Sequence, residues 1–191
     1  MPRWLSAALG AFVVGAVALI VLIWWLPGPR TELPTGSAYA SAGDSTVSAV
    51  GLPDARRTPG SVNPKVTPDT ISTTICVTGW TATVRPPAAY TSALKLVQIV
   101  EYGYADRDPS HYEEDHLVPL ELGGAPRDPR NLWPEPRDAV LGDGTEVGAD
   151  AKDGLENLLH KQVCSGTLAL ADAQRSIAGN WIAAWQAAGR P

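Results

Sequence analysis

The stretch YEEDHLVPLELGGAPRDPRNLWPEP, residues 112–136, decides the fold, and it holds one of only three histidines among 191 residues. Asp115 and His116 are neighbours in it, so in an extended backbone their side chains point to opposite faces. An apolar run follows, and the turn-forming pairs at 123–124 and 128–129 bring the chain back. The stretch therefore predicts a hairpin that carries polar groups on an apolar footing. A plain surface Asp-His pair is the alternative interpretation.

The order of residues in this stretch also carries a resemblance. Asp-His, an apolar-Pro-Leu run, a Gly-Gly turn and Asn-Leu succeed one another. This order resembles the first two thirds of the HNH endonuclease motif, a ββα-metal fold in which two strands and a helix hold one divalent ion. The resemblance implies that His116 is the general base, that Asp115 is a metal ligand and that Asn131 holds the loop that orients the base. It covers only part of the chain, and the zinc-knuckle cysteine pairs of many HNH proteins are absent from the sequence.

Residues 151–164, AKDGLENLLHKQVC, predict the helix that such a site requires after the hairpin. Glu156 and His160 are four residues apart and therefore lie on one face of this helix. We expect Asp115, His160 and Glu156 to bind one divalent metal ion, with Asn157 as a substitute for Glu156. Oxygen and nitrogen ligands of this kind accept magnesium, manganese or zinc. An ordinary exposed Glu-His pair is the alternative.

These residue types suit the hydrolysis of a phosphodiester. A divalent cation neutralises the phosphate and stabilises the leaving oxygen, while a neutral imidazole takes a proton from water. A backbone carbonyl in the loop held by Asn131 would fix the tautomer of His116 by accepting the proton of its other ring nitrogen. The sequence thus predicts a metal-dependent nuclease, with DNA favoured over RNA. Its expected substrate-binding residues are Arg127, Arg130 and Lys161, and Arg137 lies close enough to the motif to join them in a local phosphate-binding patch.

The charge of the chain argues against nucleic-acid binding. From Gly60 onward the sequence has 11 Lys and Arg but 17 Asp and Glu, whereas nucleic-acid binders usually present a basic surface. A second hypothesis is therefore a membrane-anchored, exported interaction module that keeps the HNH-like frame without catalysis. Metal-dependent nicking of plasmid DNA separates the two hypotheses.

A membrane segment is predicted at the N-terminus. Residues 4–26 contain no charged side chain, and at about 1.5 Å per residue they are long enough to cross a bilayer core of about 30 Å. Tryptophans lie near both ends of the segment, as in an aromatic belt. We predict a transmembrane signal anchor over residues 1–27, with the globular domain outside the cytoplasm. A cleaved signal peptide is the alternative, because small residues at 38–42 suit cleavage.

The rest of the chain is expected to form a linker and one domain. Residues 28–68 are rich in Gly, Pro, Ser, Ala and Thr and predict a flexible linker. Residues 69–191 are enough for one α+β domain, in which flanking helices surround a small HNH-like core of a hairpin and a helix. The last segment, residues 167–189, has apolar residues at helical spacing and is expected to close the core.

Two further segments have recognisable local patterns. Residues 73–84 are rich in β-branched and aromatic side chains and predict a strand. Residues 91–103 predict a helix with Leu94, Val97 and Val100 on the face that packs on the core.

The chain has two cysteines, Cys76 and Cys164. An even pair in an exported domain most simply forms one disulfide. Closing so long a loop would stabilise the fold by about 4–5 kcal/mol in the chain-entropy model. Two reduced core thiols in a cytosolic domain are the alternative.

Overall fold

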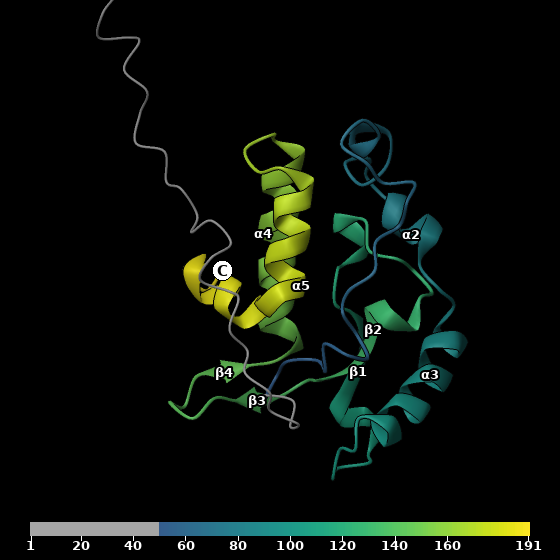
Figure 1. Ribbon diagram of the computed structural model, residues 1–191, viewed down its shortest axis with the longest axis vertical. Helices are drawn as coiled ribbons and strands as arrows, with labels where there is room; N and C mark the ends of the chain where they lie inside the picture. Colours follow the sequence, from purple (N-terminus) through teal and green to yellow (C-terminus); the bar gives the residue numbers. More distant parts are fainter. Residues whose placement is uncertain (1–49) are drawn as a thin grey trace, which may run out of the picture. The chain divides into compact units, whose positions relative to one another are not determined.

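The structure, a computed structural model, describes residues 50–191, which belong to one compact unit. It combines helices with two small two-stranded sheets, so the predicted α+β class is confirmed (Figure 1). The predicted signal anchor, residues 1–27, lies outside the described residues. None of the helices between residues 50 and 191 combines the length and the apolar character that a membrane crossing requires.

The elements of the described part follow one another along the chain with short connections. In chain order they are η1 (Ile71–Thr73), α2 (Trp80–Val84), α3 (Ala88–Glu101), η2 (Pro109–His111), β1 (Tyr112–His116), η3 (Leu120–Leu122), η4 (Pro129–Asn131), β2 (Leu132–Pro136), β3 (Ala139–Val140), β4 (Glu146–Val147), α4 (Ala149–Cys164) and α5 (Leu170–Ala187).

The predicted hairpin is formed by β1 and β2, which pair in antiparallel fashion. Asp115 lies opposite Trp133 and His116 lies opposite Leu132. Because successive side chains of a strand point to opposite faces, Asp115 points toward α4 and contacts Lys152, while His116 points toward the side covered by α3. Asp115 and His116 therefore point to opposite faces of the strand, as the sequence predicts.

The apolar core lies between the hairpin connection and the two long C-terminal helices, α4 and α5, which pack side by side (Figure 1). Both helices bury residues at a spacing of three or four, so that one stripe of each faces the other. The buried stripe of α5 includes Ala173, Ile177 and Trp181, none of which is exposed. The helix predicted for residues 167–189 therefore closes the core, as expected.

The strand predicted for residues 73–84 is wrong, because this segment forms the end of η1, a series of turns and the short helix α2. Its threonines satisfy local carbonyls instead of packing on a sheet. Thr74 Oγ1 donates to Thr70 O at 2.7 Å, and Thr83 Oγ1 donates to Trp80 O at 2.7 Å. Such side-chain hydrogen bonds compete with strand pairing, and neither two-stranded sheet of the described residues includes this segment.

The helix predicted for residues 91–103 is present as α3, but its inward face differs from the prediction. Val97 and Val100 are 53% and 63% exposed. The buried residues of α3 are Gln98 and Ile99, and its polar side chains bind the backbone of the hairpin region. Gln98 Nε2 donates to Leu132 O at 3.0 Å, and Lys95 Nζ donates to the carbonyls of Pro109 and Tyr112 at 2.8 and 2.9 Å.

Part of the predicted linker is packed into the domain. Thr58 is 1% exposed and Val66 5% exposed. The indole Nε1 of Trp181 donates to Gly51 O at 2.8 Å, and Val62 forms an isolated bridge with Gly124. Residues 51–68 therefore belong to the domain, although the sequence places its start at residue 69. The remainder of the linker, up to residue 49, lies outside the described residues.

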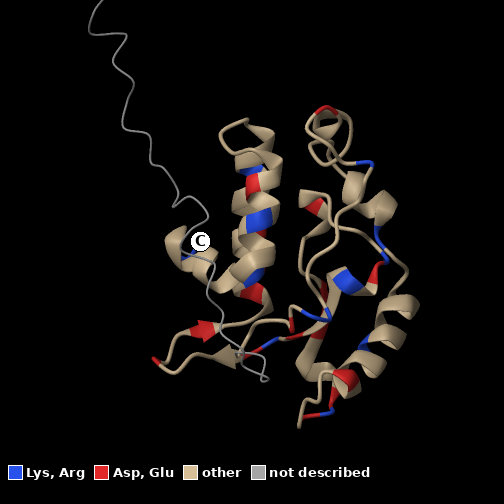
Figure 2. Ribbon diagram, in the orientation of Figure 1, with Lys and Arg blue, Asp and Glu red and all other residues tan. Residues whose placement is uncertain are grey.

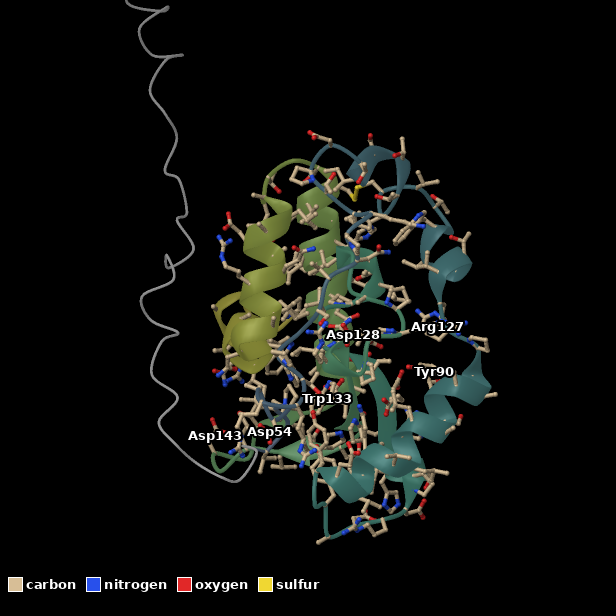
Figure 3. All side chains as sticks on the ribbon, turned by 45° about the vertical axis from the view of Figure 1, so that its right-hand side comes forward. Asp54, Tyr90, Arg127, Asp128, Trp133 and Asp143 are labelled. Carbon is tan, nitrogen blue, oxygen red and sulfur yellow. A yellow bond between two sulfur atoms is a disulfide. The ribbon has the colours of Figure 1, made fainter. Side chains whose placement is uncertain are left out.

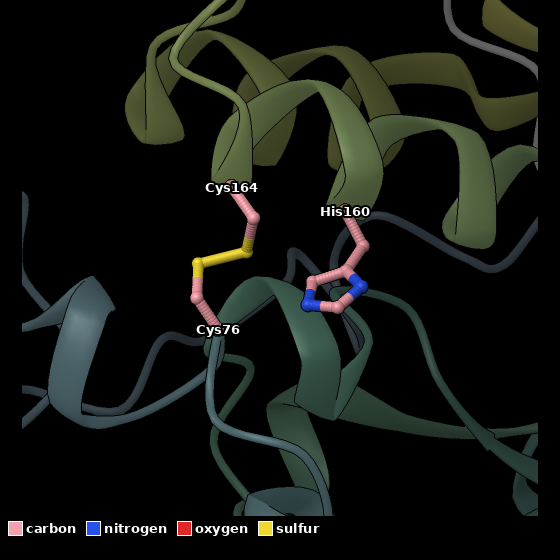
Figure 4. Close-up of side chains that lie close together, drawn as sticks. All are labelled: Cys76, His160 and Cys164. Carbon is pink, nitrogen blue, oxygen red and sulfur yellow. A yellow bond between two sulfur atoms is a disulfide. The ribbon is translucent and has the colours of Figure 1, made fainter.

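The predicted disulfide is confirmed. Cys76 and Cys164 are bonded, with Cα atoms 5.6 Å apart and 88 positions apart in the sequence. The bond ties the turn region after η1 to the C-terminal end of α4 (Figure 4). It thereby fixes the segment that leads into α2, which packs against η3, and into α3, which packs against β1 and β2.

Candidate functional site

The long connection between β1 and β2 is held together by Asn131. This side chain is completely buried. Its Oδ1 accepts from Val118 N at 2.9 Å, and its Nδ2 donates to Val118 O at 2.9 Å and to Ala125 O at 3.2 Å. At Gly124, an added Cβ would lie 1.7 Å from Val118 O, so the close approach requires glycine there. The Asn-Leu and Gly-Gly parts of the sequence pattern thus fix one compact loop.

The same loop orients His116. The ring Nε2 of His116 lies 3.0 Å from the carbonyl oxygen of Pro126, which is next to Ala125 in the loop. A carbonyl only accepts hydrogen bonds, so the neutral ring carries its proton on Nε2 and leaves Nδ1 as the basic nitrogen. Burial lowers the pKa of His116, against the opposing effects of the Pro126 hydrogen bond and the Asp115 charge. The ring is therefore neutral at pH 7, as a base must be.

His116 lines a cavity of about 330 Å³ beside α3. Three cationic side chains line the same cavity, namely Arg85 after α2, Lys95 on α3 and Arg137 after β2. Glu113 and Glu114 of β1 complete its charged lining. Elsewhere in the domain basic residues occur among more numerous acidic ones, as on α4 (Figure 2). The cavity thus gathers cations in a domain that is acidic as a whole.

On the opposite face of β1, a buried lysine takes the place expected for a metal ion. Lys152 of α4 is 1% exposed. Its Nζ lies 2.5 Å from Asp115 Oδ2, donates to His116 O at 3.0 Å and forms an ion pair with Glu156. Burial alone would lower the pKa of Lys152, but the carboxylates of Asp115 and Glu156 outweigh it and raise the pKa. Lys152 therefore stays charged.

A third acidic residue, Glu135 of β2, is 1% exposed beside this group. Burial raises the pKa of Glu135 well above its usual value, and a hydrogen bond with Asp115 acts in the same direction. For Asp115 the ammonium of Lys152 overcomes the effect of burial and lowers the pKa. Glu135 is thus a protonated member of the group and Asp115 an ionised one, while burial also raises the pKa of Glu156, to about 8, against the effect of the Lys152 ammonium.

His160 does not join Asp115 and Glu156. Its Nε2 lies 2.9 Å from Ile75 O, and its Nδ1 lies 3.9 Å from Glu121 Oε2. Figure 4 shows the ring beside the disulfide. Asn157, the proposed substitute for Glu156, is exposed and donates to a carbonyl of its own helix.

The predicted metal ligands do not fit one ion together. Asp115 and Glu156 converge, but on the ammonium of Lys152, and His160 is hydrogen-bonded elsewhere. Within residues 50–191, the one group of three or more ligand-type side chains with ligand atoms within 4.8 Å of one another is Cys76, His160 and Cys164. Two of these are joined in the disulfide, so their sulfurs are not the thiolates that a metal ion requires.

The basic residues expected to bind substrate lie outside the cavity. Arg127 stacks over the ring of Tyr90 at 5.5 Å from its centroid, and Figure 3 labels both side chains. Arg130 is paired with Asp128 at 2.7 Å. Lys161 is exposed on α4.

Two of the three cations that line the cavity, Arg85 and Lys95, were missed by the sequence prediction. Arg137 directly follows the quoted stretch, and its position there is the signal that placed it in the expected phosphate-binding patch. Arg85 and Lys95 lie far from the motif along the chain and carry no motif signal. Only the packing of α3 and of the segment before it against β1 brings them to His116.

The chain matches no protein-family model, no curated protein and no solved structure. The resemblance to HNH endonucleases therefore stays a prediction. The features of the chain that bear on its function are His116, the loop that orients its ring and the cavity that it lines.

Proposed function

We propose that this chain is a nuclease that hydrolyses phosphodiester bonds, with DNA favoured over RNA and with His116 as general base. One observation carries the proposal. The loop held by Asn131 presents the Pro126 carbonyl to Nε2 of His116, which leaves Nδ1 as the basic nitrogen of a neutral ring in a cavity lined by cations. A positioned neutral imidazole beside a bound phosphate is the arrangement that deprotonates an attacking water.

The order of elements supports the finer form of the fold, an HNH-like core. The hairpin of β1 and β2 is followed by α4, and α4 contacts the residue before the proposed base through Lys152. Asp115 points toward α4, and His116 points into the cavity on the other side of β1. We infer that the hairpin and α4 form the catalytic frame, with the other helices as its support.

The cations of the cavity are suited to hold the phosphate. Arg85 has no ion pair among the described residues, and its guanidinium provides a planar fork for two phosphate oxygens. Arg137 donates from Nη1 to Glu113 at 2.9 Å, which leaves its other guanidinium nitrogen atoms available to a phosphate. Lys95 already donates to two carbonyls, so it contributes mainly charge. Arg85 is therefore the first choice as a phosphate ligand.

The predicted divalent ion has no assigned step in this proposal. Asp115 and Glu156 already surround the ammonium of Lys152, and His160 lies against Ile75 O. These three side chains would have to exchange their partners and come together before they could hold one ion. The chemistry proposed here uses the protein side chains of the cavity.

The location proposed for the enzyme is outside the cytoplasm, tethered by the predicted anchor. The disulfide supports this location, because disulfides persist in oxidising compartments. The anchor itself, residues 1–27, lies outside the described residues.

Nicking of supercoiled plasmid by the full-length protein tests the proposal. Wild type should nick DNA, and His116→Ala should lower the rate by about 10²- to 10⁴-fold. His111→Ala is the matched control, because His111 is exposed and pairs only with Asp106. Assays with chelator and with added magnesium, manganese or zinc measure the metal requirement, and an RNA substrate measures the preference for DNA. Equal rates in wild type and His116→Ala, or no cleavage at all, would favour the interaction module instead.

A further inference from the structure

We propose that Glu114 is the general acid of this reaction, so that one strand face supplies both proton-transfer groups. The inference rests on the proposed nuclease function and extends it. Glu114 and His116 are two residues apart on β1 and therefore point to the same face. Both line the cavity that holds the three cations.

The carboxyl group of Glu114 is unusual in its surroundings. Both of its oxygen atoms are buried, and neither has a hydrogen-bond partner among the described residues. An ionised carboxylate in such a place would lack compensation for its lost hydration. Burial of the neutral acid costs much less free energy than burial of the carboxylate, and the neutral acid carries a proton that it can donate. The geometry thus favours a protonated carboxyl group beside the base.

The surroundings of Glu114 act in both directions on this state, and burial is the largest effect. Burial and the charge of Asp115 together raise the pKa of Glu114 to about 8, although the charge of Lys95 on α3 acts in the opposite direction. Lys95 is held by two backbone carbonyls and does not bond the carboxyl. Arg85 and Arg137 reach the cavity from the segments after α2 and β2.

The other acidic groups near the site have different partners. Glu113 pairs with Arg137 at 2.9 Å. Asp115 and Glu156 pair with Lys152. Glu135 lies with that lysine group and does not line the cavity. Among residues 50–191, Glu114 is thus the cavity-lining carboxyl group without an ionic partner.

The proposed step is balanced by these two side chains and water. His116 Nδ1 takes a proton from water while the water oxygen forms a bond to phosphorus. The bond from phosphorus to the 3′ oxygen breaks, and the carboxyl proton of Glu114 passes to that oxygen. The products are a 5′ phosphate and a 3′ hydroxyl, with Glu114 left ionised and His116 protonated. Exchange of one proton with solvent at each residue restores the starting state.

A comparison of leaving groups tests the role of Glu114 in the full-length protein. In DNA the leaving group is the 3′ oxygen, which would depart as an unstable alkoxide unless it receives a proton. Bis(p-nitrophenyl) phosphate instead releases p-nitrophenolate, which is stable without a proton. Glu114→Gln should lower DNA cleavage by about 10²- to 10⁴-fold and lower cleavage of the nitrophenyl ester by less than about tenfold. His116→Ala should lower both rates strongly.

Controls separate this result from misfolding and from failure of the proposed function. Glu146→Gln, at an exposed position on β4, should change neither rate. Glutamine has the shape of glutamate, so thermal unfolding of Glu114→Gln should match wild type at pH 6; Glu114→Ala repeats the comparison without the carboxyl group. Equal losses on both substrates, or no loss on DNA, would overturn the assignment. A wild-type protein inactive on both substrates would instead overturn the nuclease function itself.

Discussion

Lys152 is the residue that most changes the interpretation of the hairpin. An ammonium has three donor protons, and the three partners of Lys152 are Asp115, Glu156 and the carbonyl of His116. The lysine therefore ties α4 to both members of the Asp-His pair. It supplies inside the protein a positive charge of the kind that the resemblance assigns to a metal ion.

Removal of this charge should destabilise the fold. Lys152→Met leaves the buried Asp115 carboxylate, with Glu156 beside it, without a counter-charge, and we expect a loss of about 3–5 kcal/mol in the free energy of unfolding at pH 7.5. Lys152→Met combined with Asp115→Asn and Glu156→Gln should recover most of the loss, because no uncompensated charge remains. Urea unfolding measures each variant.

Lys161→Met is the matched control for this series, because Lys161 is exposed on the same helix. It should change the free energy of unfolding by no more than about 0.5 kcal/mol. A loss of similar size in Lys152→Met and Lys161→Met would mean that the buried ion group does not hold α4 to the hairpin.

At the scale of elements, the connection between β1 and β2 depends on one amide. Asn131→Ala leaves the buried N–H and C=O of Val118 without their partner, which costs about 1–3 kcal/mol for each group. It also frees Ala125 O, and with it the adjacent Pro126 carbonyl that orients His116. We expect lower stability and, at temperatures where the variant is folded, a lower rate of DNA cleavage.

Two further substitutions sharpen this prediction. Asn131→Asp keeps an acceptor for Val118 N but lacks both N–H donors, so it should also lose stability and activity. Asn157→Ala removes an exposed amide with one hydrogen bond inside its own helix and should leave both nearly unchanged. Full activity of folded Asn131→Ala would show that His116 does not need the loop.

The elements that the sequence predicted well are those whose pattern and environment agree. The hairpin has its turn residues, and α5 has apolar residues that meet α4. Residues 73–84 have the composition of a strand, but no strand among residues 50–191 pairs with them, and a disulfide and local threonine hydrogen bonds hold their conformation. In α3 the inward side combines the apolar Ile99 with Lys95 and Gln98, which bind carbonyls of the hairpin region. Such backbone recognition leaves no hydrophobic period in the sequence.

At the scale of the whole molecule, the candidate site was predictable only where it lies in one stretch. His116 and Asn131 belong to the hairpin, and the carbonyl expected for the histidine is that of Pro126. The cavity also needs Arg85, Lys95 and the packing of α3 on β1. Long-range packing of this kind has no signature in one sequence, so the sequence favours the two arginines of the stretch and Lys161 of the following helix as substrate-binding residues instead.

The N-terminal limit of the domain gives the last prediction. A chain that begins at residue 50 keeps Gly51 O as the acceptor of Trp181 Nε1 and keeps Thr58 and Val66 in their buried places. A chain that begins at residue 69 loses all three. The lost burial of a valine costs about 1.5–3 kcal/mol, and an unpartnered buried indole N–H costs about 1–3 kcal/mol.

Thermal and urea unfolding of three chains, beginning at residues 50, 60 and 69, measure this difference. The first should unfold cooperatively at the highest midpoint. The second keeps Val66 but lacks Gly51 and Thr58, so it should be intermediate, and the third should be the least stable or unfolded. We expect this order because residues 51–68 contact both the hairpin and α5. Thr58 Oγ1 donates to Leu132 O of the hairpin, and Gly51 O accepts from Trp181 of α5. Equal midpoints for the chains that begin at residues 50 and 69 would mean that residues 51–68 do not stabilise the domain and belong to the linker, as the sequence predicts.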